Sequence, residues 1–274
     1  MRTILYNRSV TAFSKDQLVS TLKACSLIKK IYFFLTIDST NNYARILAEE
    51  GAPEGTLVIS EEQTAGRGRM GRSWISPPGT GIWISVILRP NISPPRAALI
   101  TPLVAVALNR SIREVTGLPS GIKWPNDILI RGKKAAGILT EISTDQASIR
   151  YIIVGIGINV NTEYFPEEIR DQATSLSLSS GQQISRLKIL LSLLLELERQ
   201  YLDFTRKKDC DSILLDYRKM SVTIGNQVLI PGPDGKLTVE AIDITETGGL
   251  LIKSGDGTTE EIISGEVQHL IFTP

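Results

Sequence analysis

The chain has 274 residues and a mass of 30.1 kDa, which accommodates one large domain or a medium-sized domain followed by a small one. Apolar residues make up 42% and charged residues 22%, proportions that exclude an intrinsically disordered chain. The 30 Lys and Arg residues nearly balance the 29 Asp and Glu residues, so a net charge of +1 gives the whole molecule no attraction for nucleic acid or for an anionic membrane.

Histidine and cysteine are scarce, which excludes several kinds of site. His269 is the only histidine, so a Ser-His-Asp or Cys-His site would have to use it, and an HExxH zinc site would need two. Cys25 and Cys210 lie far apart without a CxxC pair, which argues against a zinc ribbon, an iron–sulfur cluster or a disulfide framework. We therefore expect a metal to be a hard cation on oxygen ligands, with Mg²⁺ carried in with a phosphate group as the favoured case.

The opening sequence MRTILYNRSVTAFSK lacks an apolar stretch of signal-peptide length. No run in the chain approaches the roughly 18 apolar residues that span a bilayer. We therefore expect a cytoplasmic protein in a reducing compartment that does not enter a membrane.

Helices and strands are predicted to be mixed over the first 220 residues. In chain order the first elements are a helix over Thr11–Lys30, a strand over Ile31–Ile37, a helix over Asn41–Glu50, and strands over Thr56–Ser60 and Gly81–Leu88. The later elements are a helix over Pro95–Thr116, strands over Ser120–Trp124, Ala136–Ser143 and Ile149–Val160, and helices over Ser185–Phe204 and Asp209–Lys219. Strands and helices do not alternate strictly, which predicts an α+β fold.

The pattern changes from about Val222 onward. The turns PDG, TGG and GDG separate the short runs VLI, TVEAIDI, LLIKS and TEEII. Short alternating runs between glycine turns are typical of a small barrel of antiparallel strands. The sequence therefore predicts two domains, residues 1–220 and residues 221–274.

A glycine- and arginine-rich loop, EEQTAGRGRMGRSW, occupies Glu61–Trp74. Its glycines satisfy G-x-G-x-x-G, and the segment would also be a P-loop if Arg72 were Lys. Both motifs must lead into a helix, and the following ISPPGTG cannot start one. A dinucleotide site also needs an acidic residue about twenty positions further on, and Gln63–Arg113 contains no Asp or Glu. Both generic motifs are rejected.

The acid-free stretch carries a strong local charge. It contains seven arginines and no lysine, in a protein of net charge +1. Arginine binds carboxylate and phosphate groups through two parallel hydrogen bonds. The glycines between the arginines let backbone N–H groups approach an oxyanion. These features favour an anion-binding loop. A solvated flexible loop and an Arg-Gly contact with nucleic acid are the alternatives.

Three further clusters combine polar residues with apolar strands. Lys123-Trp124-Pro125-Asn126-Asp127 follows a predicted strand and either forms a tight hairpin or holds phosphate and Mg²⁺ together. Lys133 and Lys134 begin an apolar strand, where a lysine is either a solvated edge residue or a cation directed at an anion. The paired glycines of GIGINVN (155–161) indicate that some group approaches the strand backbone closely, or that a helix packs tightly on it.

Taken in order, DSTN (38–41), EEQTAGRGRMGRSW, KWPND, KKAAGIL and GIGINVN resemble the biotin–protein ligase family over about residues 31–274. The resemblance implies a class II synthetase-like α+β catalytic domain of the biotin/lipoate ligase type, with a central mixed sheet, followed by an SH3-like barrel. It also implies a two-step reaction. Biotin and MgATP would give biotinyl-5′-AMP and pyrophosphate, and a lysine of a biotin carboxyl carrier protein domain would then take the biotinyl group.

The resemblance also implies a role for individual residues. The residues at the biotin site would be Ser39, Thr40, Asn41, Gln63, Gly66, Arg67, Gly68, Arg69, Lys134 and Gly137. The residues that serve ATP would be Arg69, Arg72, Trp74, Lys123, Asn126, Asp127 and Asn159, with Trp74 covering the adenine and Mg²⁺ near Asp127. Lys134 has the family's spacing before Gly137, and Lys133 is the adjacent alternative if the register slips.

Three of these residues are the expected catalytic ones. A carboxylate and a phosphate oxygen about 4 Å apart repel by roughly 4 kcal/mol at an effective dielectric near 20, which Arg69 and Lys134 can offset. The attacking lysine has a pKa of about 10.4 and is protonated at neutral pH, so Asp127 is the candidate for orienting or deprotonating it. We expect the Gly/Arg loop to order on ligand binding and to shield the mixed anhydride from water.

Some members of the family also carry an N-terminal DNA-binding domain. The residues that precede Ser39 are too few for a winged helix–turn–helix, so we expect a monofunctional enzyme without specific DNA binding. Lipoate–protein ligase or octanoyl transferase, a nucleic-acid-binding protein, and a regulator that binds biotinyl-AMP without transferring it are the alternative functions. The sequence leaves a homodimer through an exposed sheet edge open.

Overall fold

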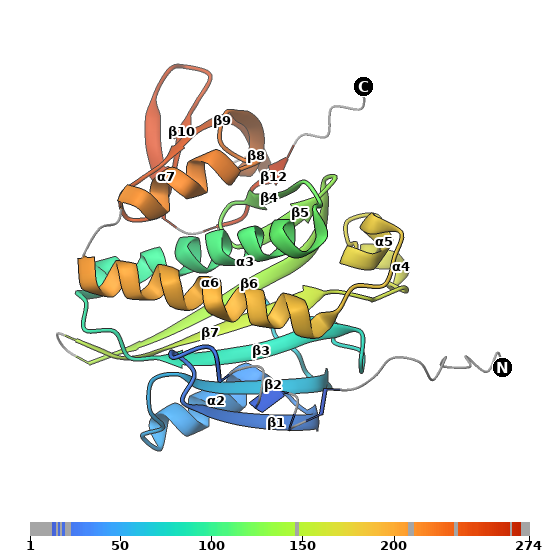
Figure 1. Ribbon diagram of the computed structural model, residues 1–274. Coiled ribbons are helices and arrows are strands. Elements are labelled where there is room, and N and C mark those ends of the chain that lie inside the picture. Colours follow the sequence, from blue (N-terminus) through green and yellow to red (C-terminus); the bar gives the residue numbers. More distant parts are fainter. Residues whose placement is uncertain are drawn as a thin grey trace.

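A seven-stranded mixed sheet runs through the centre of the computed structural model, which describes residues 13–269 apart from residues 15, 17, 20–22, 146–147, 208–210, 233–234 and 264 (Figure 1). The strand order is β1-β2-β3-β7-β6-β5-β4. The β1–β2 pair is parallel and the other neighbouring pairs are antiparallel. The strands are β1 (Lys30–Ile37), β2 (Thr56–Gln63), β3 (Gly81–Leu88), β4 (Ser120–Lys123), β5 (Asp127–Ile130), β6 (Lys133–Thr144) and β7 (Ile149–Asn159).

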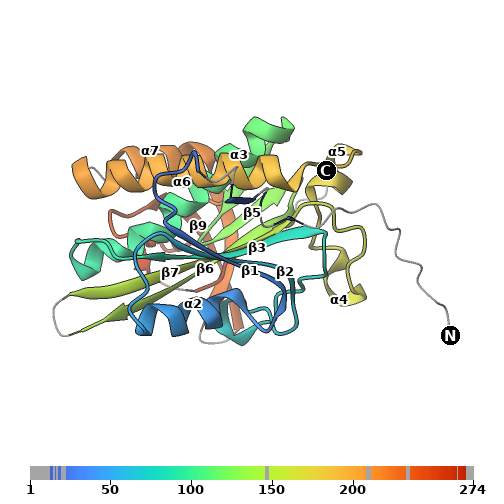
Figure 2. The same cartoon turned by 60° about the horizontal axis from the view of Figure 1, so that its bottom comes forward.

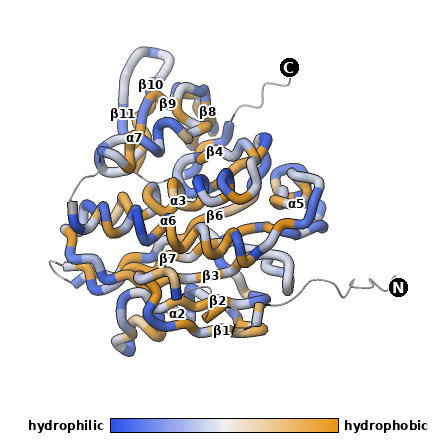
Figure 3. Tube along the Cα trace, in the orientation of Figure 1, coloured by the Kyte–Doolittle hydropathy of each residue, from blue (hydrophilic) through white to orange (hydrophobic). Residues whose placement is uncertain are grey.

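Helices cover both faces of this sheet. The long helices α3 (Ile100–Thr116) and α6 (Arg186–Lys207) pack on one face, and α2 (Thr40–Glu49) lies on the other (Figure 2). All eight residues of β3 are buried because both of its faces are covered. Apolar residues accordingly gather on the inner strands and on the helix faces toward them (Figure 3). Among the described residues, no helix is long and apolar enough to cross a membrane.

The structure corrects several predicted elements. The helix predicted over Pro95–Thr116 begins as a 3₁₀ segment, Pro94–Leu99, and becomes α-helical only at Ile100. Pro102 has no N–H to donate to the Ala98 carbonyl, so α-helical hydrogen bonding cannot continue across this junction. Residues 23–29 form turns rather than the end of the helix predicted over Thr11–Lys30. Asp16, Leu18 and Val19 are helical as predicted, and residues 11, 12, 15, 17 and 20–22 of that prediction lie outside the described residues. Strand β5 and the short helices α4 (Glu167–Arg170) and α5 (Leu176–Ser180) were not predicted.

A second sheet, of five antiparallel strands, follows α7 (Asp211–Met220), and it confirms the small β domain predicted at the C-terminal end. Its order is β11-β10-β9-β8-β12, with β8 (Asn226–Gly232), β9 (Gly235–Ile244), β10 (Leu250–Lys253), β11 (Thr259–Ile262) and β12 (Gln268–His269). Trp124 joins the two parts, since its Nε1–H donates to the Gly248 carbonyl at 3.1 Å and its backbone N–H to Thr223 Oγ1 at 2.9 Å.

The same junction makes stability depend on pH. His269 is half-buried with Nε2 3.0 Å from Thr223 Oγ1, and burial lowers its pKa to about 4. The unfolded chain therefore takes up a proton near pH 6.5, whereas the folded protein does so only near pH 4, so stability is full above about pH 6.5 and falls between these values. We expect the free energy of unfolding, measured with denaturant, to be about 1 kcal/mol smaller at pH 4.5 than at pH 7. This value already includes the reduction by solvent screening at a half-buried side chain. His269→Gln should remove that part of the loss, and an unchanged pH dependence in this variant would contradict the assignment.

Candidate active site

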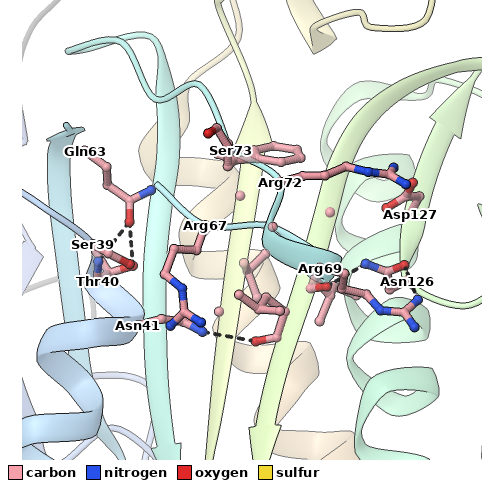
Figure 4. A pocket seen from close by; sticks show the side chains of 18 of the residues that line it. Ser39, Thr40, Asn41, Gln63, Arg67, Arg69, Arg72, Ser73, Asn126 and Asp127 are labelled. Carbon is pink, nitrogen blue, oxygen red and sulfur yellow. Dashed lines mark hydrogen bonds between the residues drawn. The ribbon is translucent and has the colours of Figure 1, made fainter. Parts of the chain in front are cut away.

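An open pocket lies on the α2 face of the large sheet (Figure 4). Its floor comes from β6 and β7, one side comes from the start of α2, and the Gly/Arg loop between β2 and β3 crosses it. Glu266, from the segment between β11 and β12, also borders it. The pocket is thus built from elements far apart in the sequence.

One end of the pocket is a neutral, hydrogen-bonded wall. Gln63 Oε1 accepts from the backbone N–H of Thr40 at 2.8 Å and from its hydroxyl at 3.1 Å, and Gln63 Nε2 donates to Ser76 Oγ at 2.8 Å. Ser85 Oγ lies 2.8 Å from Thr40 Oγ1 and 2.6 Å from Asn41 Oδ1. These contacts hold each side chain in one orientation, which suits recognition of a polar, uncharged ligand group.

The paired glycines of β7 make room for two side chains. A Cβ on Gly155 would lie 2.1 Å from Asn41 Oδ1, and one on Gly157 would lie 2.5 Å from the Trp74 ring. On β6, a Cβ on Gly137 would lie 3.0 Å from the same ring. Close approach to the strand backbone, predicted for the GIGINVN segment, is therefore present, and the approaching groups belong to the α2 helix and the Gly/Arg loop.

The other end of the pocket is cationic. Lys134 Nζ lies 2.7 Å from Asp127 Oδ1 and 5.2 Å from the centre of the Trp74 ring. Arg69 Nη1 donates to Asn126 Oδ1 at 3.2 Å. Burial lowers the pKa of Arg69, although the carboxylate of Asp127 acts in the opposite direction. Arg69 contacts a neutral amide and Lys134 contacts a single carboxylate, so both cations can still bind an anionic group of a ligand.

Two further arginines of the loop have carboxylate partners that sequence analysis missed. Arg67 Nη1 lies 3.1 Å from Glu141 Oε1 and 3.0 Å from Asn42 Oδ1. Both terminal nitrogens of Arg72 donate to the carboxylate of Glu266, and this hydrogen bonding lowers the pKa of Glu266. Strand alternation places Glu141 on the pocket face, but only the tertiary fold brings either acid to the loop.

Most predicted site residues surround this one pocket. Those that line it are Ser39, Thr40, Asn41, Gln63, Arg67, Gly68, Arg69, Arg72, Trp74, Asn126, Asp127, Lys134 and Gly137. Three others do not line it. They are Gly66, Lys123 and Asn159. Gly66 lies against the backbone of the same loop, where a Cβ would be 2.3 Å from the Trp74 carbonyl. Burial lowers the pKa of Lys123, and Asn159 Nδ2 donates to the Thr174 carbonyl at 3.2 Å. The binding roles of all these residues stay predictions.

Comparison with known proteins identifies the family. Residues 33–159 match the model of the Biotin/lipoate A/B protein ligase family, and residues 223–270 match the Biotin protein ligase C terminal domain. The bifunctional ligase/repressor BirA of Bacillus subtilis is 38% identical over 257 residues, which cover 93% of this chain and 78% of that protein. The chain belongs to the biotin protein ligase family.

Other members of the family agree with this assignment. The biotin–[acetyl-CoA-carboxylase] ligase of Mycobacterium tuberculosis is 35% identical over 238 residues, which cover 85% of this chain and 86% of that protein. The solved structure of the Aquifex aeolicus biotin protein ligase in complex with biotin and ATP superposes with a TM-score of 0.76 at 33% identity, covering 88% of this chain and 98% of that one. The predicted family, the two-part fold and the assignment as a ligase enzyme are thereby confirmed.

Proposed function

We propose that this biotin protein ligase activates biotin as biotinyl-5′-AMP and transfers the biotinyl group to one lysine of a biotin carboxyl carrier protein domain. The observation that carries the proposal is the division of a single pocket into a neutral hydrogen-bonded wall and a cationic end. Biotin has the same division, since its ring urea is polar and uncharged and its side chain ends in a carboxylate. The named substrates of relatives point the same way.

In this assignment the urea of biotin faces Thr40, Asn41 and Gln63, and its carboxylate reaches Lys134 and Arg69. The anionic carboxylate must approach the anionic α-phosphate of ATP, which costs roughly 4 kcal/mol at about 4 Å and an effective dielectric near 20. Lys134 and Arg69 both line the cationic end of the pocket, so in this assignment they would offset the repulsion between the two anions.

In the first step a carboxylate oxygen of biotin attacks the α-phosphorus of ATP. The bond from that phosphorus to the oxygen bridging the β-phosphate breaks, and pyrophosphate leaves. In the second step the ε-amine of the carrier lysine attacks the acyl carbon of the mixed anhydride, AMP leaves with the carbon–oxygen bond electrons, and the proton that the amine loses passes to solvent. Asp127 borders the cationic end, where its carboxylate can orient the incoming amine.

Magnesium is proposed to enter with ATP. Within the described part of the chain, no group of three or more His, Cys, Asp or Glu residues could form a metal site on its own. Asp127 and Glu266 border the pocket, and Mg²⁺ is commonly bound by one or two carboxylates together with substrate phosphates. The ion would neutralise phosphate charge.

We also propose a catalytic unit over residues 1–220, a second unit over 221–274, and a cytoplasmic location.

The test is the mass of a biotin-acceptor domain after incubation with the protein, biotin and MgATP. We expect the acceptor to gain one biotinyl group, and to gain nothing when ATP is omitted or when lipoate replaces biotin. Enzyme-bound biotinyl-AMP without labelling of the acceptor would contradict the transfer step or the choice of carrier. Absence of both products would contradict the proposed function, and labelling by lipoate would favour a lipoate ligase.

A further inference from the structure

Glu141 lies next to the neutral wall of the pocket, in contact with the lining residues Asn41 and Arg67, and has no role in the function proposed above. It is on β6, where side chains alternate between the two faces of the sheet, so it shares the pocket face with Gly137 and Leu139. Its cross-strand neighbour is Ile153, two residues before Gly155. A half-buried carboxylate at this place needs partners, and the structure supplies two.

The two carboxylate oxygens of Glu141 have different partners. Oε2 accepts from Asn41 Nδ2 at 2.8 Å, and Oε1 accepts from Arg67 Nη1 at 3.1 Å. Asn41 is on α2, and Arg67 is on the Gly/Arg loop. One side chain therefore joins the helix that forms the neutral wall to the loop that crosses the pocket.

The contact with Asn41 determines the orientation of its amide. An ionised carboxylate only accepts hydrogen bonds, so the Asn41 NH₂ group must face Glu141 and its carbonyl oxygen must face the Ser85 hydroxyl, 2.6 Å away. Asn41 is buried, and an amide turned the other way would set two acceptors against each other at 2.8 Å. Glu141 thus selects which amide atoms Asn41 presents along the wall.

We propose that Glu141 is a positioning residue for biotin, a role that rests on the function proposed above. It fixes the Asn41 amide and anchors the first arginine of the Gly/Arg loop, so that the neutral wall and the adjoining part of the loop are already arranged before the ligand arrives. Biotin binding then does not have to supply the free energy needed to order these groups. The effect belongs to the neutral end of the pocket, where the urea of biotin is proposed to bind, and leaves the cationic end unchanged.

Calorimetric titration with biotin, adenylation kinetics and tryptic cleavage of the ligand-free loop test this proposal. Glu141→Ala removes both contacts, and we expect biotin to bind about tenfold more weakly, as for loss of a hydrogen bond to a buried polar group. The KM for ATP and kcat should stay within about twofold, a split that general destabilisation would not produce. Cleavage after Arg67 should be up to about fivefold faster, the range for an exposed ion pair.

A reciprocal exchange serves as the second test if Glu141→Ala folds poorly. Asn41→Asp sets two carboxylates against each other and should weaken biotin binding. Adding Glu141→Gln restores a donor facing the new acid, so the double variant should recover most of the affinity. Glu49→Gln is the matched control, because Glu49 is on α2 outside the pocket and, among the side chains that the structure describes, accepts only from Tyr151.

Unchanged biotin affinity in Glu141→Ala would overturn the proposal, as would a double variant that binds no better than Asn41→Asp alone. If the wild-type protein does not bind biotin at all, the proposed function itself fails. Wild-type binding with unaffected variants overturns only the role of Glu141.

Discussion

Replacing Lys134 by alanine is expected to lower kcat/KM for biotinyl-AMP formation by up to about a thousandfold. Lys134 lies at the cationic end of the pocket, where its ammonium group would separate the carboxylate of biotin from the α-phosphate of ATP. Because Arg69 remains, the uncompensated repulsion reaches at most about 4 kcal/mol, which corresponds to a factor of up to roughly a thousand in rate. Pyrophosphate release under biotin- and ATP-limited conditions measures the effect.

Lys133 provides the matched control, because it is the adjacent residue, carries the same charge and is exposed. Lys133→Ala should stay within about threefold of wild type. The Lys134→Ala backbone should remain in place, since the Lys134 N–H donates to the Gln172 carbonyl at 2.7 Å and its carbonyl accepts from Thr174 at 2.9 Å. Full activity in Lys134→Ala with a large loss in Lys133→Ala would transfer the role to Lys133.

Elements with a long local signal could be predicted from sequence, and short ones could not. Strand β3 and the last residue of α3 agree with their predictions, because apolar alternation in GIWISVIL and the left-handed Gly117 are local features. Strand β5 was missed because DILI is short and directly follows Asn126, a turn-forming residue. The order of the sheet depends on long-range pairing, which no local pattern contains.

The candidate site shows the same division. The Gly/Arg loop, KWPND and KKAAGIL could be placed near one another because together they resemble a family. The residues that complete the polar network could not be, since Ser85, Glu141 and Glu266 lie outside these motifs. Ser85 is on β3, Glu141 is on β6 just after KKAAGIL, and Glu266 is in the segment between β11 and β12. Nor did the sequence show that the loop's Arg67 and Arg72 would be paired with carboxylates. Those contacts arise only from packing.

These ion pairs change how the loop's charge acts. The seven arginines of the acid-free stretch are not a free positive surface, because Arg67 and Arg72 contact carboxylates from β6 and from the C-terminal part of the chain. Arg69 instead contacts the neutral amide of Asn126, so it keeps its charge available to a ligand. This distribution favours one localised anion over extended binding of nucleic acid.

Replacing Gly155 by alanine is expected to weaken biotin binding by up to about a hundredfold. The added methyl group would lie 2.1 Å from Asn41 Oδ1, and β7 is paired on both sides, with Ser85 on β3 and Leu139 on β6, so its backbone has little freedom to move. Asn41 must therefore leave its place and lose its hydrogen bonds to the neutral wall. Overpacking of this kind costs about 1–3 kcal/mol of folding stability when the packing is kept. Where bound biotin requires Asn41 in its original place, the same cost opposes binding, and the higher value corresponds to a factor of about a hundred in affinity. Biotin titration and denaturant unfolding measure both effects.

A double-mutant cycle with Asn41→Ala tests whether the effect passes through that side chain. Once Asn41 is shortened, the methyl group of Gly155→Ala has room, so the second substitution should cost little and the two effects should not add. Gly255→Ala is the control, since its Cβ would meet nothing within 4 Å and its backbone does not need a positive φ. Full additivity in the cycle would show that Gly155 acts on biotin by some route other than Asn41, and the close approach of the Asn41 amide would then not explain why a glycine begins the GIGINVN segment.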